Sequence, residues 1–212
     1  SDLDLLAVLG RAPDEGMGNS SQRLMLLRPG PAGLFPERPQ QVLSFEAARL
    51  TPSVTDLDGD GRQDLVVRQF RLPDFSDVLT GLEFELSFFW YRGDGRAFER
   101  QPTLRDDRTY DEEQMEELIA RRVFGPDLSG DGLGDLVEVD LQGRISIRRL
   151  TRESGFFSGT TWGLERSAWK RFDATGSIGE LEVRDVNGDG IGDVLSATER
   201  GLTAILSQGG RR

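Results

Sequence analysis

Apolar and polar residues alternate along much of the chain, a pattern typical of β-strands with one buried face. The clearest example is residues 82–91, where every second residue from Leu82 to Trp90 is large and apolar. Shorter runs of the same kind predict further strands at residues 3–9, 22–28, 65–70, 136–141, 144–150, 194–198 and 202–206. Segments rich in glycine, proline and asparagine separate several of these runs. The pattern therefore predicts an all-β fold.

One segment follows a helical spacing instead. Thr109 and Glu112 have the spacing of a capping box, and the residues from Met115 to Val123 continue with apolar side chains at helical intervals. The acidic run at residues 111–117 would then be a solvated face near the helix N-terminus. We therefore expect one short helix inserted between strand-rich units.

A nine-residue acidic segment occurs three times, each time directly before a predicted strand. The copies read DLDGDGRQD at residues 56–64, DLSGDGLGD at 127–135 and DVNGDGIGD at 185–193. Side chains that carry oxygen occupy the first, third, fifth and ninth places, and glycine occupies the fourth and sixth. Because glycine permits the positive φ values of a sharp turn, each copy predicts a tight loop that leads into a β-strand.

Such a loop can direct several oxygen atoms toward one point, as a Ca²⁺ site requires. Alternate side chains of the loop point inward, the carbonyl oxygen of the seventh residue can join them, and the ninth carboxylate completes the shell. Ca²⁺ takes six to eight oxygen ligands of this kind. We therefore expect three Ca²⁺ sites, whose ligands are Asp56, Asp58, Asp60, Arg62 and Asp64; Asp127, Ser129, Asp131, Leu133 and Asp135; and Asp185, Asn187, Asp189, Ile191 and Asp193.

The three loops differ most at their third place, which holds Asp58, Ser129 or Asn187. A hydroxyl is a poorer Ca²⁺ ligand than a carboxylate or an amide carbonyl, and the charge of the ligands tunes affinity. We therefore expect the first loop to bind most tightly and the middle loop most weakly.

The loop begins like that of an EF-hand but ends differently. An EF-hand has a bidentate glutamate at its twelfth place, and a large apolar residue is expected at its eighth. The twelfth places here hold Val67, Glu138 and Ser196, and the eighth places hold Gln63, Gly134 and Gly192. The acid at the ninth place instead resembles the FG-GAP/VCBS-type repeat, the Ca²⁺-binding β-hairpin loop of integrin-α-like β-propellers. The resemblance extends over nearly the whole chain.

The resemblance implies a single domain of β-propeller-type blades, with about three and a half repeat units. The units fall roughly at residues 1–36, 37–99, 120–158 and 178–210. The first unit lacks a metal loop and the last stops before the aromatic residue that closes the others. We therefore expect a partial propeller, completed by further sequence, a second copy or another chain. The alternative is a small ring, closed by pairing of the first and last predicted strands.

Composition narrows the chemistry that this chain can perform. It contains no cysteine and no histidine, so it has no disulfide, no thiol chemistry and no serine–histidine triad. The formal net charge of −11 argues against nucleic acid as a partner. Ten aspartates lie in the three loops, and three divalent cations would bring the net charge to −5.

The expected Ca²⁺ sites also indicate the compartment in which the protein acts. Ca²⁺ sites with dissociation constants of about 10⁻⁴ M, typical of extracellular modules, would be empty at cytosolic Ca²⁺ levels. We therefore expect a secreted, periplasmic or cell-surface protein. No apolar run is long enough to span a membrane. All the basic residues except Lys170 are arginines, a bias typical of bacteria with GC-rich genomes.

The resemblance implies a binding or structural module whose exposed loops meet a protein or carbohydrate partner, as in cell adhesion. The alternative is the blade portion of a secreted enzyme, a lyase or hydrolase acting on polysaccharides. Its candidate acids, Glu83 and Glu85, share a strand face about 7 Å apart. Two exposed glutamates on an edge strand are the more ordinary interpretation, so the sequence predicts no catalytic residues.

Two further motifs have a structural and a functional interpretation. The tripeptide Arg92-Gly93-Asp94 matches an integrin-recognition sequence, but YRGDGRAF also fits a turn closed by Phe98, which we favour. Trp162 and Trp169 could form a platform for a sugar, although packing between blades is the interpretation that we favour.

Overall fold

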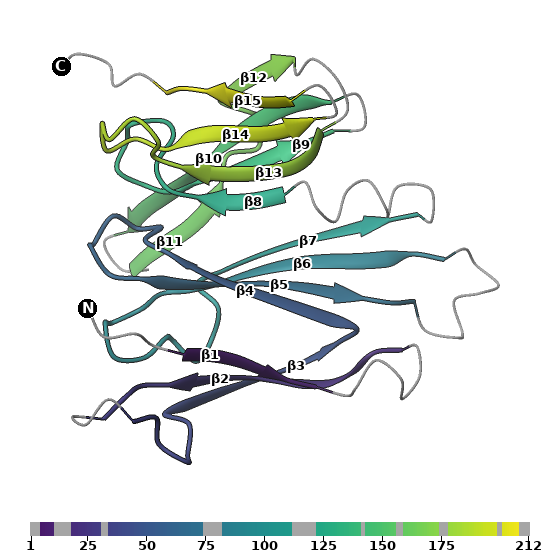
Figure 1. Ribbon diagram of the computed structural model, residues 1–212, viewed down its shortest axis with the longest axis vertical. Helices are drawn as coiled ribbons and strands as arrows, with labels where there is room; N and C mark the ends of the chain where they lie inside the picture. Colours follow the sequence, from purple (N-terminus) through teal and green to yellow (C-terminus); the bar gives the residue numbers. More distant parts are fainter. Residues whose placement is uncertain are drawn as a thin grey trace. The chain divides into compact units, whose positions relative to one another are not determined.

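The computed structural model describes residues 5–10, 18–30, 34–73, 82–111, 122–140, 143–155, 159–173, 178–198 and 201–207. These residues form four antiparallel sheets of three to five strands, so the all-β prediction is confirmed (Figure 1). Contacts divide the chain into two compact units, residues 1–54 with 64–112 and residues 55–63 with 113–212.

The first unit contains a three-stranded and a four-stranded sheet. The three-stranded sheet has the order β1 (Leu5–Leu9), β2 (Ser20–Leu27) and β3 (Gln41–Ala47). The four-stranded sheet has the order β4 (Arg49–Thr55), β5 (Asp64–Arg71), β6 (Phe84–Tyr91) and β7 (Leu104–Tyr110). Since β3 pairs with β2 from residue 41 to residue 47, it belongs to the first sheet, although the repeat pattern groups these residues with the next unit.

Apolar side chains from β3, β5 and β6 form the core of this unit. The ring of Phe45 lies 5.8 Å from that of Phe89 and 6.4 Å from that of Tyr91, centroid to centroid. Leu65 and Val67 from β5 are fully buried in the same cluster. The strand predicted at residues 82–91 is confirmed from residue 84 onward, where it lies between β5 and β7. Both of its faces are buried after residue 85, and one of them contributes Phe89 and Tyr91 to this core.

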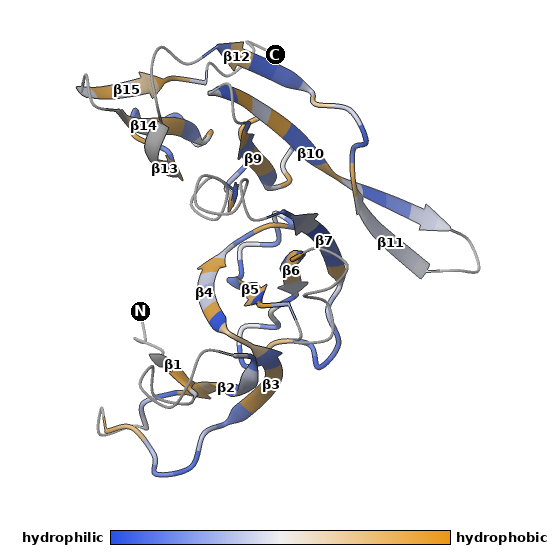
Figure 2. Ribbon diagram, turned by 90° about the vertical axis from the view of Figure 1, so that its right-hand side faces the viewer, coloured by the Kyte–Doolittle hydropathy of each residue, from blue (hydrophilic) through white to orange (hydrophobic). Residues whose placement is uncertain are grey.

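The second unit contains a five-stranded and a three-stranded sheet. The larger is built from β8 (Arg122–Gly125), β9 (Asp135–Val139), β10 (Arg144–Gly155), β11 (Gly159–Leu164) and β12 (Lys170–Asp173). The smaller has the order β13 (Ile178–Arg184), β14 (Asp193–Thr198) and β15 (Gly201–Ile205). Strand β10 pairs with β9 and β12 in its first half and with β11 in its second half. Hydrophobic and hydrophilic residues alternate at its start, whereas its second half is mostly hydrophilic (Figure 2).

The core of the second unit joins its two sheets. Val137, Ile145 and Ile147 from the larger sheet pack with Leu181 and Val194 from the smaller. Strands β8 and β13 are in contact, as are the loops that follow them. The two sheets of this unit therefore share one apolar core.

The predicted helix is not present in the described part of the chain. Thr109, its expected capping residue, lies in β7 and pairs with Glu85 of β6. Arg122 and Val123, at its expected end, begin β8. The intervening residues 112–121 lie outside the described residues. The capping-box spacing therefore misled, because Tyr110, which would be the first helical residue after the cap, also lies in β7 and pairs with Phe84 of β6.

Candidate metal centre

The three acidic segments form tight loops at equivalent places in three sheets. Each loop joins the first strand of its sheet to the second: β4 to β5, β8 to β9 and β13 to β14. The glycines at the fourth and sixth places all have positive φ, between 71° and 89°; they are Gly59, Gly61, Gly130, Gly132, Gly188 and Gly190. The turn predicted from these glycines is therefore confirmed in all three copies.

The first aspartate of each loop holds this turn together. Asp56 accepts hydrogen bonds from the N–H groups of Gly59 and Gly61 at 2.9 and 2.8 Å. The equivalent bonds are 2.6 and 2.7 Å long at Asp127, and 2.7 and 2.9 Å long at Asp185. At the exposed Asp185, hydrogen bonds from the backbone, that of Gly190 first, lower the pKa of the carboxyl group.

The fifth and seventh places are linked in the same way in each loop. The fifth-place aspartates are Asp60, Asp131 and Asp189, and each accepts the N–H of the seventh residue at 2.9 Å. The donors are the backbone groups of Arg62, Leu133 and Ile191. The loops therefore have one common backbone design, although their third places differ.

The ninth aspartate begins the following strand and is buried in all three copies. Asp64, Asp135 and Asp193 are between 0% and 1% exposed. Asp64 accepts the N–H of Gly93, and Asp193 that of Ser207, which lie beyond the far ends of the neighbouring strands β6 and β15. In the first and last loops this carboxylate thus ties the loop to its own sheet.

Asp135 is the least satisfied of these buried acids. Its Oδ2 accepts the N–H groups of Leu128 and Ser129 at 2.8 Å, whereas its buried Oδ1 has no hydrogen-bond partner. Burial raises its pKa to about 7, and the negative charges of Asp131 and Asp127 act in the same direction. A cation in this loop would oppose both effects by favouring the ionised carboxylate.

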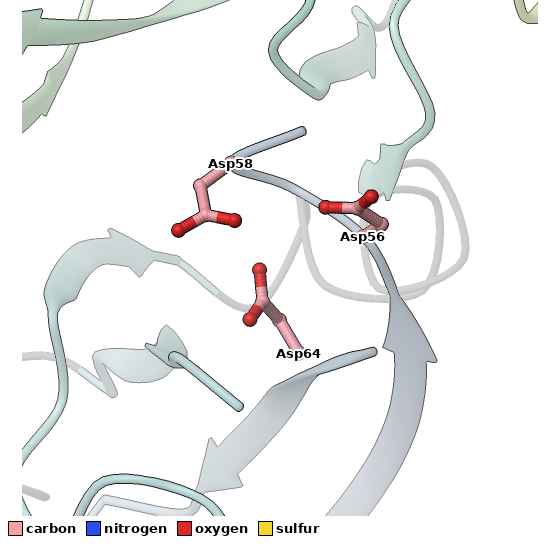
Figure 3. A group of neighbouring side chains, drawn as sticks. All are labelled: Asp56, Asp58 and Asp64. Carbon is pink, nitrogen blue, oxygen red and sulfur yellow. The ribbon is translucent and has the colours of Figure 1, made fainter. Parts of the chain in front are cut away.

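Carboxylates converge most closely in the first loop. Oxygen atoms of Asp56, Asp58 and Asp64 all lie within 4.8 Å of one another, and the carboxylates of Asp58 and Asp64 face each other (Figure 3). Asp58 and Asp64 are buried, at 7% and 1% exposure. Three carboxylates without nitrogen or sulfur ligands fit a hard cation such as Ca²⁺ or Mg²⁺. This group therefore fits the cation expected from the sequence.

The remaining predicted ligands are arranged less favourably. Asp60 lies outside the converging group and comes within 3.9 Å of the guanidinium of Arg62. Within the described residues, neither the loop at 127–135 nor that at 185–193 brings three carboxylates together in the same way. In the last loop Asp185, Asn187 and Asp189 are all exposed. To hold a cation, each of these two loops would have to turn its own carboxylates toward one point. In the first loop the carboxylates already converge in this way.

A feature of the eighth place was not predicted from the sequence. Gly134 and Gly192 are buried and lack positive φ, so conformational freedom does not explain a glycine at either position. The N–H of Gly134 donates to the carbonyl oxygen of Leu57 at 2.8 Å, and that of Gly192 to the carbonyl oxygen of Asp127 at 2.5 Å. The eighth place holds glycine in two copies, whereas the first copy has Gln63, which is exposed. This difference was the sequence signal that could have revealed the contacts.

The other candidate groups have structural partners. Asp94 of the Arg-Gly-Asp tripeptide lies in a turn, where its N–H donates to the carbonyl oxygen of Ala97 at 3.0 Å and Gly93 forms a bridge with Phe98. The predicted turn is therefore confirmed. The carboxylate of Glu85 accepts hydrogen bonds from Arg71 and Arg105 at 3.0 and 3.3 Å.

Both tryptophans named as a possible sugar platform lie next to cationic side chains. The ammonium of Lys170 lies 4.3 Å from the ring centroid of Trp169, and the guanidinium of Arg149 lies 5.9 Å from it. Trp169 also packs against the core of the second unit. The guanidinium of Arg152 lies 5.7 Å from the ring centroid of Trp162. Stacking of a sugar would have to compete with these cation–π contacts.

Comparison with known proteins gives no match from which to assign a function, so the assignment is argued from the three loops. No protein-family model matches the chain, and no curated protein matches its sequence. Among the described residues, no helix has the length and apolar character needed to cross a membrane.

Proposed function

We propose that this protein is a Ca²⁺-stabilised binding or structural module that acts outside the cytoplasm. In this proposal, blades of the FG-GAP/VCBS type hold Ca²⁺ in their first loops and present exposed loops to a protein or carbohydrate partner. The single observation that carries the proposal is the convergence of Asp56, Asp58 and Asp64 in one tight loop. Oxygen ligands alone, and three negative charges, favour a hard divalent cation.

The repetition of the loop supports the same proposal. Three sheets place the same turn between their first and second strands, with the same hydrogen bonds from glycine N–H groups to the first aspartate. A single acidic turn is common in proteins, but one backbone design at three equivalent places is not explained by turn formation alone. A cation would link the start of the loop to the strand that follows it.

An edge of the last sheet supports a partner that completes the fold. Strand β15 pairs with β14, and the part of the chain that the structure describes places no strand on its other side. Leu202 is 72% exposed and Leu206 is 52% exposed on or beside this edge. Proteins usually cover or charge such edges, so we propose that a second chain or further sequence of the same protein pairs here.

Direct Ca²⁺ binding tests the proposal. Isothermal titration of the metal-free chain with CaCl₂ should detect binding, with dissociation constants of about 10⁻⁴ M for an extracellular module. The variant Asp58→Ala should lose the tightest site, and Asp107→Ala, which removes an exposed carboxylate outside the loops, should bind as the unaltered protein does. Absence of heat and of bound Ca²⁺ at millimolar concentrations would reject the proposal.

A further inference from the structure

Hydrogen bonds join the three loops in a row, and the second compact unit contains residues 56–63 of the first loop together with both later loops. The middle loop contacts the first through the hydrogen bond from Gly134 to the carbonyl oxygen of Leu57. The last loop contacts the middle one through the bond from Gly192 to the carbonyl oxygen of Asp127. Each contact therefore uses the eighth residue of one loop and the first or second residue of the loop before it.

Both contacts depend on the absence of a side chain at the eighth place. A Cβ atom on Gly134 would lie 2.3 Å from Cδ2 of Leu57 and 2.8 Å from the carbonyl oxygen of Gly125. A Cβ atom on Gly192 would lie 2.9 Å from Cγ of Pro126 and 3.2 Å from the carbonyl oxygen of Asp127. Since both glycines lack positive φ, close approach between loops is the physical reason for glycine here.

One acceptor carbonyl belongs to a predicted ligand of the cation, and the other belongs to the residue between two predicted ligands. Asp127 is the first predicted ligand of the middle loop, and Leu57 lies between Asp56 and Asp58 in the first. A cation that fixes these carboxylates also fixes the backbone to which they are attached. The hydrogen bond then restricts the eighth residue of the next loop, directly before its buried ninth carboxylate.

We propose that the three loops bind Ca²⁺ as a coupled row, in which Gly134 and Gly192 are positioning residues that transmit the ordering of one loop to the next. This inference rests on the proposed Ca²⁺ function of the loops. Coupling between binding sites is reciprocal, so each filled loop raises the affinity of its neighbour and is stabilised by it to the same degree. The middle loop has a neighbour on each side and is coupled to both.

The row begins at the first loop. Its eighth residue is Gln63, which is exposed, so no other loop of the described residues packs against this position. The same place in the other two loops is occupied by a buried glycine. This difference supplies a matched control, because Gln63→Ala puts a methyl group at the first loop's eighth place without affecting a loop contact.

Each loop has its own reporter for a binding experiment. The amide groups of Gly61, Gly132 and Gly190 donate to the first aspartates of their loops at 2.8, 2.7 and 2.9 Å. Titration of the isotope-labelled chain with CaCl₂, followed by amide NMR, therefore gives a half-saturation concentration for each loop separately.

Removing the middle site tests the coupling. The variant Asp131→Ala should raise the half-saturation concentrations reported by Gly61 and by Gly190 about fivefold or more, the lower end of typical couplings between sites. Gln63→Ala should leave all three values unchanged. If Asp131→Ala leaves the first and last loops at their original values, the loops bind independently and the proposal is wrong.

A double-mutant cycle tests the role of Gly192. Gly192→Ala alone should raise the value reported by Gly190 and leave that of Gly61 unchanged, because it separates only the last two loops. Adding Asp131→Ala should then raise the Gly190 value no further. Additive effects would show that alanine damages the last loop by itself, and would overturn the positioning role.

The two proposals fail in different ways. If no glycine amide NMR signal of the unaltered chain shifts in millimolar CaCl₂, the proposed Ca²⁺ function is wrong and the proposed coupling is wrong with it. If the amide NMR signals shift but Asp131→Ala changes only the half-saturation concentration reported by Gly132, the proposed Ca²⁺ function stands and the proposed coupling is wrong.

Discussion

Arg122 and Glu138 face each other across strands β8 and β9, with Nε of the arginine 2.6 Å from Oε1 of the glutamate. The arginine side chain is only 4% exposed. A second guanidinium, that of Arg148, donates to the other carboxylate oxygen at 2.8 Å. Glu138 is the twelfth residue counted from Asp127, the place where an EF-hand has its bidentate ligand. Because its carboxylate binds two arginines, it does not serve the loop.

Removing the charge of Glu138 should therefore destabilise the protein strongly. In Glu138→Gln, two largely buried guanidinium groups lose their carboxylate partner, and breaking a buried ion pair in this way costs about 3–5 kcal/mol. Denaturant unfolding should report this loss equally in Ca²⁺ and in chelator. The matched control is Glu182→Gln, whose carboxylate is 61% exposed and 3.6 Å from Arg184. Comparable losses for both variants would contradict the assignment.

The same cluster predicts an acid-sensitive component of stability. Burial alone would raise the pKa of Glu138, but the charges of Arg122 and Arg148 outweigh burial and hold it below its ordinary value of 4.5. A carboxyl group with a lower pKa in the folded state stabilises the fold above its unfolded pKa. This contribution is lost as the pH falls through the folded value. The free energy of unfolding, measured in chelator between pH 7 and pH 3, should therefore decline below about pH 4.5, and less steeply in Glu138→Gln.

Ca²⁺ affinity should differ between the loops. The first has four carboxylates, whereas Ser129 replaces one of them in the middle loop. With the loops uncoupled by Gly134→Ala and Gly192→Ala, Asp60→Ala should therefore remove more stability in Ca²⁺ than Asp131→Ala. The larger loss should approach the full contribution of one site, about 1.4 kcal/mol at millimolar Ca²⁺. Melting of both variants in CaCl₂ and in chelator measures the difference. Equal losses, or the reverse order, would contradict the ranking.

The contact between loops predicts a difference between two glycines. Gly134→Ala places its methyl group against the backbone of Gly125 and the buried side chain of Leu57, whereas Gly192→Ala meets atoms that are farther away. Overpacking of this kind typically costs about 1–3 kcal/mol. Gly134→Ala should therefore lower the free energy of unfolding more than Gly192→Ala, even in chelator. If alanine at position 134 is no more harmful than at 192, the approach of the loops is less close than described.

Much of the strand content could be predicted because apolar side chains alternate where strands are half buried. Strands β5, β9 and β14 follow their loops as expected, and the strand at residues 82–91 is the central strand β6. Two of the edge strands gave no such signal. β7 (LRDDRTY) and β12 (KRFD) are mostly polar, and pairing with β6 and β10 places them in their sheets. Backbone pairing is independent of side-chain hydrophobicity, so periodicity could not find them.

The candidate site was predictable in its turns and less so in its side chains. Glycine at the fourth and sixth places permits the positive φ of a sharp turn, and the structure has positive φ there in every copy. The convergence of ligands was not equally predictable, because it depends on burial: Asp58 is buried whereas Asn187, at the same place in the last loop, is exposed. Glycine at positions 134 and 192 was a signal of close approach, but which loop makes that approach depends on the neighbours in the fold, and local sequence does not contain that information.

The melting temperature in chelator and in millimolar CaCl₂ tests the central claim most directly. Three sites with dissociation constants of about 10⁻⁴ M would each add about 1.4 kcal/mol at 1 mM Ca²⁺, and together about 4 kcal/mol. That is a large share of the 5–15 kcal/mol typical of a folded domain, so melting should shift upward by several degrees. Asp58→Ala should show a smaller shift. A melting temperature that is the same in chelator and in CaCl₂ would contradict the account of these loops as Ca²⁺ sites.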